Sequence, residues 1–219
     1  MLSTAEEGGF GAKLQELDDL VEGACRLGQK MSAVPIAILF GVVSKFVRET
    51  ASQADKTVVV GFAGEDILCT RQVLGGLERP LKEMVHNCIA HAFKDSAVDR
   101  ESAGKPGPYQ IKIKAIDKGS SLLLEVGDDG CGIDCEQIRI DALEQELIDD
   151  PEKLSDDEAL AFLLDDGFGA SPPADGEEAP KPKGLIITQD SVGSIKGTMH
   201  ITSTGAEGTL ITIRIPTDG

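Results

Sequence analysis

Three polar residues, Glu83, Asn87 and His91, recur every fourth position within a stretch that is otherwise largely apolar. On an α-helix, residues four positions apart lie on one stripe. A carboxylate can act as a general base, an imidazole can exchange protons, and an amide oxygen is a suitable ligand for Mg²⁺. The stripe is therefore a candidate site, although surface helices also carry these residue types for solubility alone.

The element that must position this stripe covers residues 80–94 and is expected to be a helix. Pro80 suits the first helical turn, where its missing N–H is not needed. The apolar residues of the stretch recur at helical spacing and predict a face that packs against a core: Leu81, Met84, Val85, Cys88, Ile89 and Ala92.

Two further motifs follow along the chain. An Asp-x-Gly-x-Gly turn at residues 128–132 comes directly after an apolar run, and Gly208-Thr209 stands at a predicted hairpin before a final strand. This order, Glu-x-x-x-Asn, then Asp-x-Gly-x-Gly, then Gly-Thr, resembles the plan of the GHKL ATPases.

Composition bounds the remaining possibilities. The formal net charge of −17 disfavours binding to nucleic acid or to an anionic membrane surface, and acidic residues concentrate at 141–178. Five scattered cysteines imply no disulfide framework, so we expect a reducing, cytoplasmic setting, and Cys131 and Cys135 lack the partners of a zinc site. No signal peptide is visible, and the apolar stretch at 33–43 is too short to span a bilayer, so no direct membrane insertion is expected.

Hydrophobic patterning predicts an α+β fold. Helices are expected at 12–28, 34–54, 71–77, 80–94, 135–147, 159–164 and 185–195. Strands are expected at 56–62, 67–70, 109–115, 122–126, 198–203 and 209–215, with a polar loop at 95–108. The sheet should be mixed, with the helices on one face, which makes a two-layer α/β sandwich.

Several longer runs resemble the CheA-type chemotaxis histidine kinases from about residue 29 onward. Val34-Pro35-Ile36 resembles the hinge that leads from the dimerisation hairpin to the ATP-binding domain. Residues 64–66, Arg71 and Pro80-Leu81 resemble the run before that family's Asn-containing motif. The stretch at 100–106 resembles its Arg-x-x-Ala-Gly-Lys-Pro loop, which few unrelated GHKL proteins share.

The resemblance implies a domain organisation and a Bergerat-type ATP pocket. It gives a flexible tail at 1–11, a helical and possibly dimerising segment at 12–54, and an ATP-binding domain at 55–219 with a lid loop at 169–183. Asn87 would hold Mg²⁺ at the ATP phosphates, His91 would lie near them, and Asp128 would accept the adenine amino group. Other residues would complete the pocket: Gly130 and Gly132 at the base, Phe168 in an F-box, and Gly208 and Thr209 at the far side.

The chain departs from that family at two places. Glu83 stands where the family usually has His, and Glu83 can still act as a base or orient an acceptor. Ala90 stands where the family has Asp. Pro180-Lys181-Pro182-Lys183-Gly184 replaces a Gly-x-Gly-x-Gly phosphate loop. Two prolines delete two N–H donors, and the two lysines could offset part of that loss as point charges.

Three hypotheses follow. In the first, the chain binds Mg·ATP and phosphorylates a His on a separate domain or partner in two-component signalling, with a response regulator as a further partner in trans. In the second, it is a degenerate pseudokinase that acts as a dimerisation or regulatory scaffold. The third, a DNA-topology or mismatch-repair ATPase, is disfavoured by the negative charge. We expect no acceptor-His domain and no receptor-coupling domain, and a homodimer through the N-terminal helix.

Overall fold

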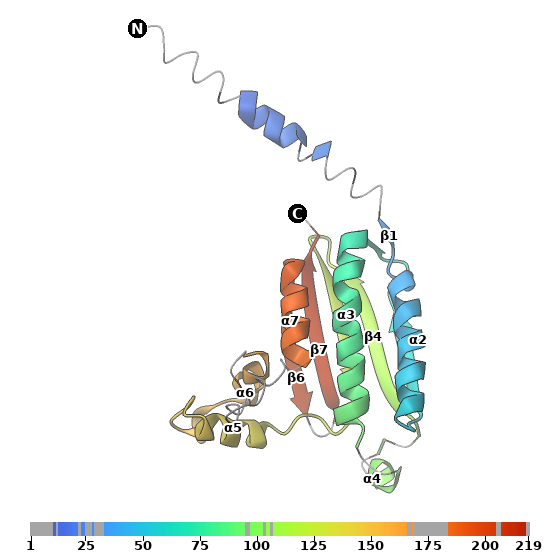
Figure 1. The fold of residues 1–219 in the computed structure, drawn as a ribbon, viewed down its shortest axis with the longest axis vertical. Coiled ribbons are helices and arrows are strands. Elements are labelled where there is room, and N and C mark those ends of the chain that lie inside the picture. The colour runs from blue at the N-terminus through green and yellow to red at the C-terminus, as the bar shows by residue number, and fades with distance from the viewer. Residues whose placement is uncertain are drawn as a thin grey trace, which may run out of the picture.

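The fold was obtained as a computed structural model, which describes residues 11–217 apart from 12, 22, 25–27, 29–32, 95–96, 103, 106, 166–167, 169–183 and 205–206. The described part has two layers, with helices covering one face of a five-stranded sheet (Figure 1). The predicted α+β two-layer sandwich is therefore confirmed. Within the described residues, no helix is both long and apolar enough to cross a membrane.

The sheet has the strand order β2-β4-β5-β7-β6. Its strands are β2 (Val58–Ala63), β4 (Tyr109–Asp117), β5 (Ser121–Asp128), β6 (Thr198–Thr204) and β7 (Gly208–Pro216). β2 runs parallel to β4, and the other neighbours are antiparallel, so the sheet is mixed as predicted. Buried side chains alternate with exposed ones along β4, which directs one face of the sheet to the helices and the other to solvent.

Three helices lie over the buried face: α2 (Ala37–Gln53), α3 (Arg71–Asn87) and α7 (Gly184–Ser194) (Figure 1). α3 lies between the other two and carries the candidate stripe. Every residue of its predicted apolar face is buried: Leu81, Met84, Val85, Cys88, Ile89 and Ala92. This face fixes the orientation of the helix, since burial of one such side chain contributes about 1.5–3 kcal/mol.

The prediction of two helices at 71–77 and 80–94 is wrong, because α3 runs through Pro80 without a break. A proline inside a helix costs about 3 kcal/mol. Leu77 and Leu81, on either side of Pro80, are both fully buried and face the same core. Their burial offsets the loss of the hydrogen bond at the proline, and so the helix continues.

The last turn of the predicted helix is a π-helix, η1 (Cys88–Ala92). Phe93 N–H donates to the Cys88 carbonyl at 3.0 Å, and a hydrogen bond between residues i and i+5 is what defines a π-helix. Single π-turns occur frequently at functional sites. Here the π-turn comes directly after Asn87.

Two local predictions need correction. The short strand expected at 67–70 is β3 (Leu68–Cys69), but it pairs with β1 (Val34–Pro35) rather than with its neighbour in sequence. The loop expected at 95–108 contains a short helix, α4 (Ala97–Ser102). Both elements depend on contacts with distant parts of the chain, which local patterning does not report.

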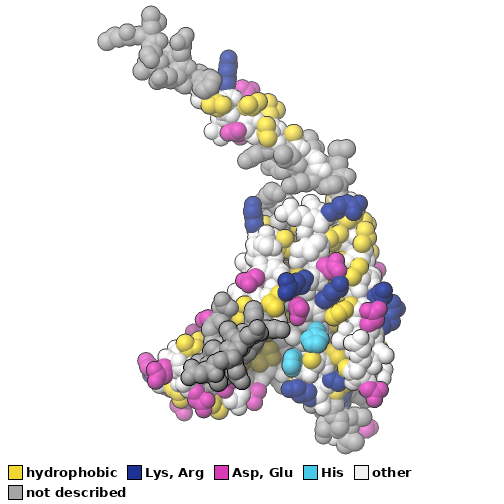
Figure 2. All heavy atoms as spheres, viewed as in Figure 1, with side chains coloured by type: hydrophobic (Ala, Val, Ile, Leu, Met, Phe, Trp, Pro, Cys, Tyr) yellow, Lys and Arg dark blue, Asp and Glu magenta, His cyan; other side chains and the backbone are white. Residues whose placement is uncertain are grey.

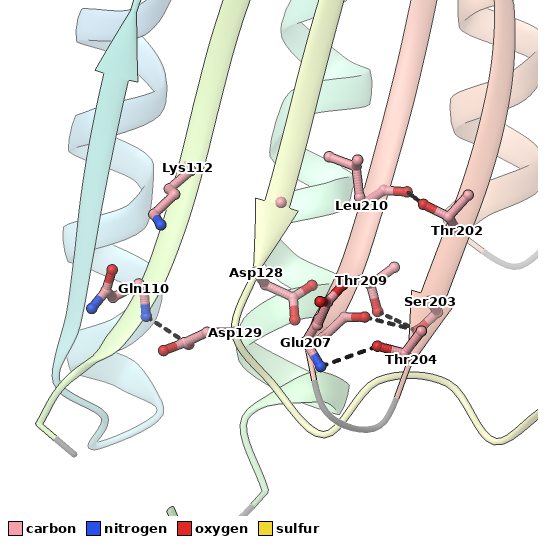
Figure 3. Close-up of a pocket in the computed structure, with 12 residues that line it drawn as sticks. Gln110, Lys112, Asp128, Asp129, Thr202, Ser203, Thr204, Glu207, Thr209 and Leu210 are labelled. Atoms are coloured by element: carbon pink, nitrogen blue, oxygen red, sulfur yellow. Dashed lines mark hydrogen bonds between the residues drawn. The ribbon is translucent and has the colours of Figure 1, made fainter. Parts of the chain in front are cut away.

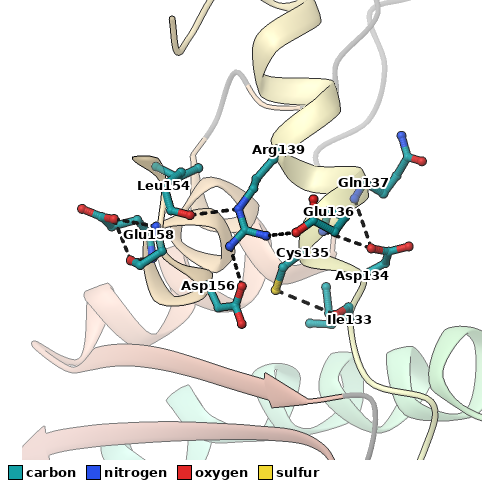
Figure 4. A network of polar contacts seen from close by, with 10 residues as sticks. Ile133, Asp134, Cys135, Glu136, Gln137, Arg139, Leu154, Asp156 and Glu158 are labelled. Atoms are coloured by element: carbon teal, nitrogen blue, oxygen red, sulfur yellow. Dashed lines mark hydrogen bonds and ion pairs between the residues drawn. The ribbon is translucent and has the colours of Figure 1, made fainter. Parts of the chain in front are cut away.

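A helical appendage follows the Asp128 turn and consists of α5 (Cys135–Glu144), η2 (Pro151–Lys153), α6 (Asp156–Ala161) and η3 (Phe162–Leu164). Arg139 holds it together, since it donates to the Leu154 carbonyl at 2.9 Å and pairs with Glu136 and Asp156 (Figure 4). A capping box begins α6, with reciprocal hydrogen bonds between Ser155 and Glu158.

The N-terminal segment is helical where it is described, including residues 13–21. Its apolar side chains Leu14, Leu17, Leu20 and Val21 are all about half exposed or more. The predicted tail at 1–11 falls almost wholly outside the described residues, as does the predicted lid loop at 169–183.

Candidate functional site

The polar stripe of α3 faces the first residue of α7. A Cβ atom added to Gly184 would lie 3.1 Å from Glu83 Oε2 and 3.4 Å from Asn87 Oδ1. Gly184 therefore lets the start of α7 come close to both side chains. The first N–H groups of a helix have no partner within the helix, and they attract anions. The structure thus brings Glu83, Asn87 and Gly184 together at a helix N-terminus.

The surroundings of His91 differ from those of Glu83 and Asn87, the other two members of the stripe. It sits in the π-turn η1, where the four-residue spacing of the α-helix no longer holds, and it is exposed, whereas Glu83 and Asn87 are half-buried. Partial burial, helped by the nearby charges of Lys94, His86 and Lys56, lowers the pKa of His91 below its ordinary value. A space-filling view shows histidine side chains, with Lys and Arg nearby, on this helical face (Figure 2).

Asp128 ends β5 with a carboxylate that is already held on both oxygens. Oδ1 accepts the Gly130 N–H at 2.9 Å, and Oδ2 accepts the Cys88 thiol at 3.4 Å. Burial raises the pKa of Asp128 above its ordinary value, and hydrogen bonds from Gly130, Cys88 and the Thr209 backbone oppose that rise. Burial also raises the pKa of the Cys88 thiol, so Cys88 remains a protonated donor at neutral pH.

The turn after Asp128 fits tightly against the end of α3. A Cβ on Gly130 would lie 2.6 Å from the Ala92 carbonyl oxygen, so only glycine fits there. The Cys131 N–H donates to the same carbonyl at 3.0 Å. Gly132, the next predicted glycine, has a φ of 73°, which favours glycine.

Gly208 and Thr209 close the other side of Asp128, at the start of β7. Gly208 has a φ of 96°, and a Cβ there would lie 2.2 Å from the Asp128 carbonyl oxygen. The Thr209 hydroxyl lies 3.1 Å from the Ser203 hydroxyl, which accepts the Ile133 N–H at 2.8 Å. These contacts join the end of the Asp128 turn to β6 and β7.

The remaining predicted site residues are placed differently. Phe168 is buried in the hydrophobic core and packs on Phe162, with ring centroids 5.5 Å apart. Lys181 and Lys183 lie outside the described residues.

Two hollows border the site. One of ≈ 360 Å³ includes Asp128, Gly208 and Thr209 among its lining residues (Figure 3). It opens on the solvent face of the sheet, because the exposed Gln110 and Lys112 also line it and the helices lie behind the strands in that view. This hollow therefore has Asp128, Gly208 and Thr209 in common with the candidate site, but it is not the predicted pocket between Asp128 and α3.

The second hollow has a volume of ≈ 550 Å³ and lies along the outer surface of α3. Glu83 and His86 line it, together with Phe46 of α2. Glu83 thus borders this outer hollow as well as Gly184.

Cys88 is the residue that sequence reasoning assigned only to the core. It follows Asn87 in the chain and contacts Asp128, so it connects the two halves of the candidate site. Its position on the apolar face hid this role. The only available signal was its adjacency to Asn87.

Comparisons with known proteins agree with this geometry. The chain is 27% identical to "Chemotaxis protein CheA" of Halobacterium salinarum over 93% of its length, and 26% identical to the protein of that name from Rhizobium meliloti over 93%. It spans only 30% and 26% of those proteins. The structure of the Acinetobacter baumannii histidine kinase AdeS has the same fold, with a TM-score of 0.51 at 15% identity, over 100% of this chain and 87% of that one.

Residues 76–219 match the family model described as "Histidine kinase-, DNA gyrase B-, and HSP90-like ATPase". The matched region begins within α3 and includes the Asp128 turn, α7 and the final hairpin. Since the match covers well over half of the chain, and the relatives are of the CheA type, the chain belongs to this family of ATPases and carries a CheA-type ATPase domain.

Proposed function

We propose that the chain binds Mg·ATP between the polar end of α3 and the Asp128 turn, and that it serves as the catalytic ATP-binding domain of a CheA-like histidine kinase. Its product would be a phosphorylated His on a separate domain or partner in two-component signalling. ATP is the substrate that supplies the phosphoryl group. Asp128 would accept the adenine amino group, and Asn87 would face the phosphates.

One observation supports this proposal above the others. Asn87 contacts the region of Gly184 at the start of α7, and the next residue, Cys88, contacts Asp128. A single turn of α3 therefore touches a group suited to a base and a helix N-terminus suited to phosphates. In the proposed complex, the base would lie at the first of these features and the phosphates at the second.

The residues present fit the groups that the proposal requires. The spaces beside Gly130 and Gly208 exclude any side chain at either position, so the backbone around Asp128 keeps one fixed shape. The amide oxygen of Asn87 and the carboxylate of Glu83 are hard oxygen donors, which suit Mg²⁺. When bound, Mg²⁺ would neutralise charge on the phosphate oxygens.

Glu83 is placed to act on the acceptor. Its carboxylate reaches Gly184 on one side and lines the outer hollow of α3 on the other. An acceptor imidazole that enters along this hollow could donate a proton to Glu83 or be oriented by it. His91 would lie near the phosphates, and its lowered pKa favours the neutral imidazole. The exposed Leu14, Leu17 and Leu20 of the N-terminal helix would pair with a second copy of the chain.

Calorimetric titration of ATP, with and without Mg²⁺, tests the proposal directly. We expect binding that strengthens with Mg²⁺, and an Asn87→Ala variant that binds ATP with no Mg²⁺ dependence. Phosphorylation of a purified acceptor domain by the wild-type chain, and its loss in Glu83→Gln, would test the catalytic step. Unchanged ATP affinity in both Asn87→Ala and Asp128→Ala would refute the site assignment.

A second candidate function is favoured by the sequence next to Gly184. Pro180 and Pro182 lack the backbone N–H donors that a phosphate loop uses, which favours a pseudokinase that scaffolds a complex. Failure of the wild-type chain to bind ATP with Mg²⁺ present would support this reading. Tight binding followed by phosphorylation of an acceptor would eliminate it.

A further inference from the structure

Three basic side chains contact the backbone behind the candidate adenine end. Lys56 Nζ donates to the Ile89 carbonyl in the π-turn, Arg100 Nη1 donates to the Asp129 carbonyl at 3.2 Å, and Lys105 Nζ donates to the Gly130 carbonyl at 2.9 Å. Each cation therefore holds a carbonyl of one of the two segments that meet beside Asp128. We call Lys56, Arg100 and Lys105 the cationic brace.

Arg100 is the most firmly fixed member of the brace. It is 3% exposed, its Nη2 pairs with Asp129 Oδ2 at 2.7 Å, and its guanidinium lies 4.2 Å from the centroid of the Tyr109 ring. Tyr109 in turn stacks on Phe93, which directly follows the π-turn. A buried guanidinium with a carboxylate partner and an aromatic face below it has little freedom to move.

Lys105 acts closest to the Asp128 carboxylate. The Lys105 N–H donates to the Arg100 carbonyl at 2.8 Å, so the loop closes on itself and directs the lysine to the turn. Its ammonium group holds the carbonyl of Gly130, and the N–H of the same Gly130 holds Asp128 Oδ1. Gly130 therefore connects Lys105 to the Asp128 carboxylate through two hydrogen bonds.

The turn is held on its other sides as well. Asp129 exchanges two hydrogen bonds with Gln110 of β4, at 2.8 and 3.2 Å, and the Cys131 N–H is held by Ala92. Because Gly130 lies against Ala92, the turn cannot move toward the helix. Arg100 and Lys105 of the brace add hydrogen bonds to the Asp129 and Gly130 carbonyls of the same turn.

We infer that the cationic brace is a positioning device that fixes the direction of the Asp128 carboxylate and so sets the selectivity for adenine. This inference rests on the proposed function, because Asp128 must face the base. It gives a role to Arg100 and Lys105 of the Arg-x-x-Ala-Gly-Lys-Pro loop, which both contact the turn. A hydrogen bond to a charged group contributes enough that its loss should weaken binding about tenfold.

The first test needs no nucleotide. Lys105→Met keeps the aliphatic stem but removes the donor, and Lys118→Met is the matched control, since Lys118 lies in the exposed hairpin between β4 and β5. Amide exchange followed by NMR should become about tenfold faster at Gly130 and Cys131 in Lys105→Met and stay unchanged in Lys118→Met. Unchanged exchange at both amides would overturn the inference, even if the chain binds no ATP.

The second test measures selectivity by competition between ATP and inosine triphosphate, which lacks the adenine amino group. We expect Lys105→Met to weaken ATP about tenfold and inosine triphosphate little, and Lys105→Arg to restore the ratio. Lys56→Met, changed at a distant position in the chain, should lower the same ratio. An equal loss for both nucleotides would show a general loss of structure and overturn the inference, whereas failure of the wild-type chain to bind ATP would refute the proposed function instead.

Discussion

The two ends of the candidate site are held in different ways. At the base end, the Asp128 carboxylate is fixed by Gly130 and Cys88, and the turn that carries it is closed in by Ala92 and the cationic brace. At the phosphate end, the described contacts are those of Gly184 with Glu83 and Asn87 at the start of α7. The four residues before Gly184 are Pro180-Lys181-Pro182-Lys183.

The proposed function would explain this difference by what each end recognises. A base is selected by hydrogen bonds of fixed direction, and so its partner needs a backbone that does not move. Phosphates are recognised largely by charge, which a lysine can supply as a point cation on a flexible stem. If the proposed function holds, substitutions next to Gly184 should affect ATP binding less than substitutions in the Asp128 turn.

The largest effect is expected from Gly208→Ala. The added Cβ would lie 2.2 Å from the Asp128 carbonyl, at a φ of 96°, so the turn must move. We expect the free energy of unfolding to fall by about 2–4 kcal/mol and ATP affinity to fall about 100-fold. Chemical denaturation and calorimetry measure the two quantities.

Gly107→Ala provides the matched control for that change. Gly107 has a similar φ of 93°, but nothing lies within 4 Å of its added Cβ. The Gly107→Ala variant should lose only about 1 kcal/mol of stability, from the strain of a side chain at positive φ, and should keep its ATP affinity. Equal losses in the two variants would show that strain, and not contact with Asp128, makes Gly208 important.

Asp128→Asn tests the base end through its charge. Burial raises the pKa of Asp128 above its ordinary value of 3.8, so the folded state favours the protonated carboxyl. The resulting stability is fully present below the unfolded pKa and is lost as pH rises through the folded pKa. The variant should thus gain stability relative to wild type as the pH rises above the ordinary Asp value of 3.8, while ATP affinity falls about 30-fold.

Denaturation curves at several pH values check this prediction. Cys88→Ala is a useful companion, because it removes one hydrogen bond from the carboxylate without changing the charge. A stability difference between Asp128→Asn and wild type that stays constant across the pH range would contradict the proposed burial of the charge.

Much of the fold was accessible from hydrophobic patterning. The alternation along β4 and the apolar face of α3 both predicted the buried sides correctly, because burial imposes these periods on the sequence. The continuous α3 was missed, since Pro80 is a strong local signal that the burial of Leu77 and Leu81 overrides. The pairing of β1 with β3 was missed because strand partners are chosen by tertiary contacts.

The candidate site divides in the same way. Spacing and resemblance predicted Asn87, Asp128 and Gly184 as site residues, and this remains a prediction. Spacing could not identify Cys88 as a partner of Asp128, nor Lys56 as a partner of the π-turn, because these contacts join residues 40 and 33 positions apart. The π-turn itself changes the surroundings of His91 and has no local sequence signature.

A smaller effect is expected at the phosphate end from replacing Pro180 and Pro182 with glycine. The variant would read Gly-Lys-Gly-Lys-Gly at 180–184 and regain two backbone donors. We expect ATP affinity to rise about three- to tenfold, with adenosine affinity unchanged. Replacing Pro172 and Pro173 with glycine is the matched control, since it makes the same change farther from Gly184. An equal rise in both variants would indicate a general effect of chain flexibility.

The smallest effect on nucleotide binding is expected from Arg139→Met in the appendage. Arg139 joins α5 to Leu154 and Asp156, and its described contacts all lie within the appendage (Figure 4). Its loss should speed amide exchange in α6 while ATP affinity stays within about twofold of wild type. Arg139→Lys, which keeps the charge, should show less of the exchange effect. A fall in ATP affinity of about tenfold would instead place the appendage among the elements that hold the nucleotide. The appendage would then be a third contributor to nucleotide binding, beside the Asp128 turn and the start of α7. The chain that leads from Asp128 into α5 would connect it to the site.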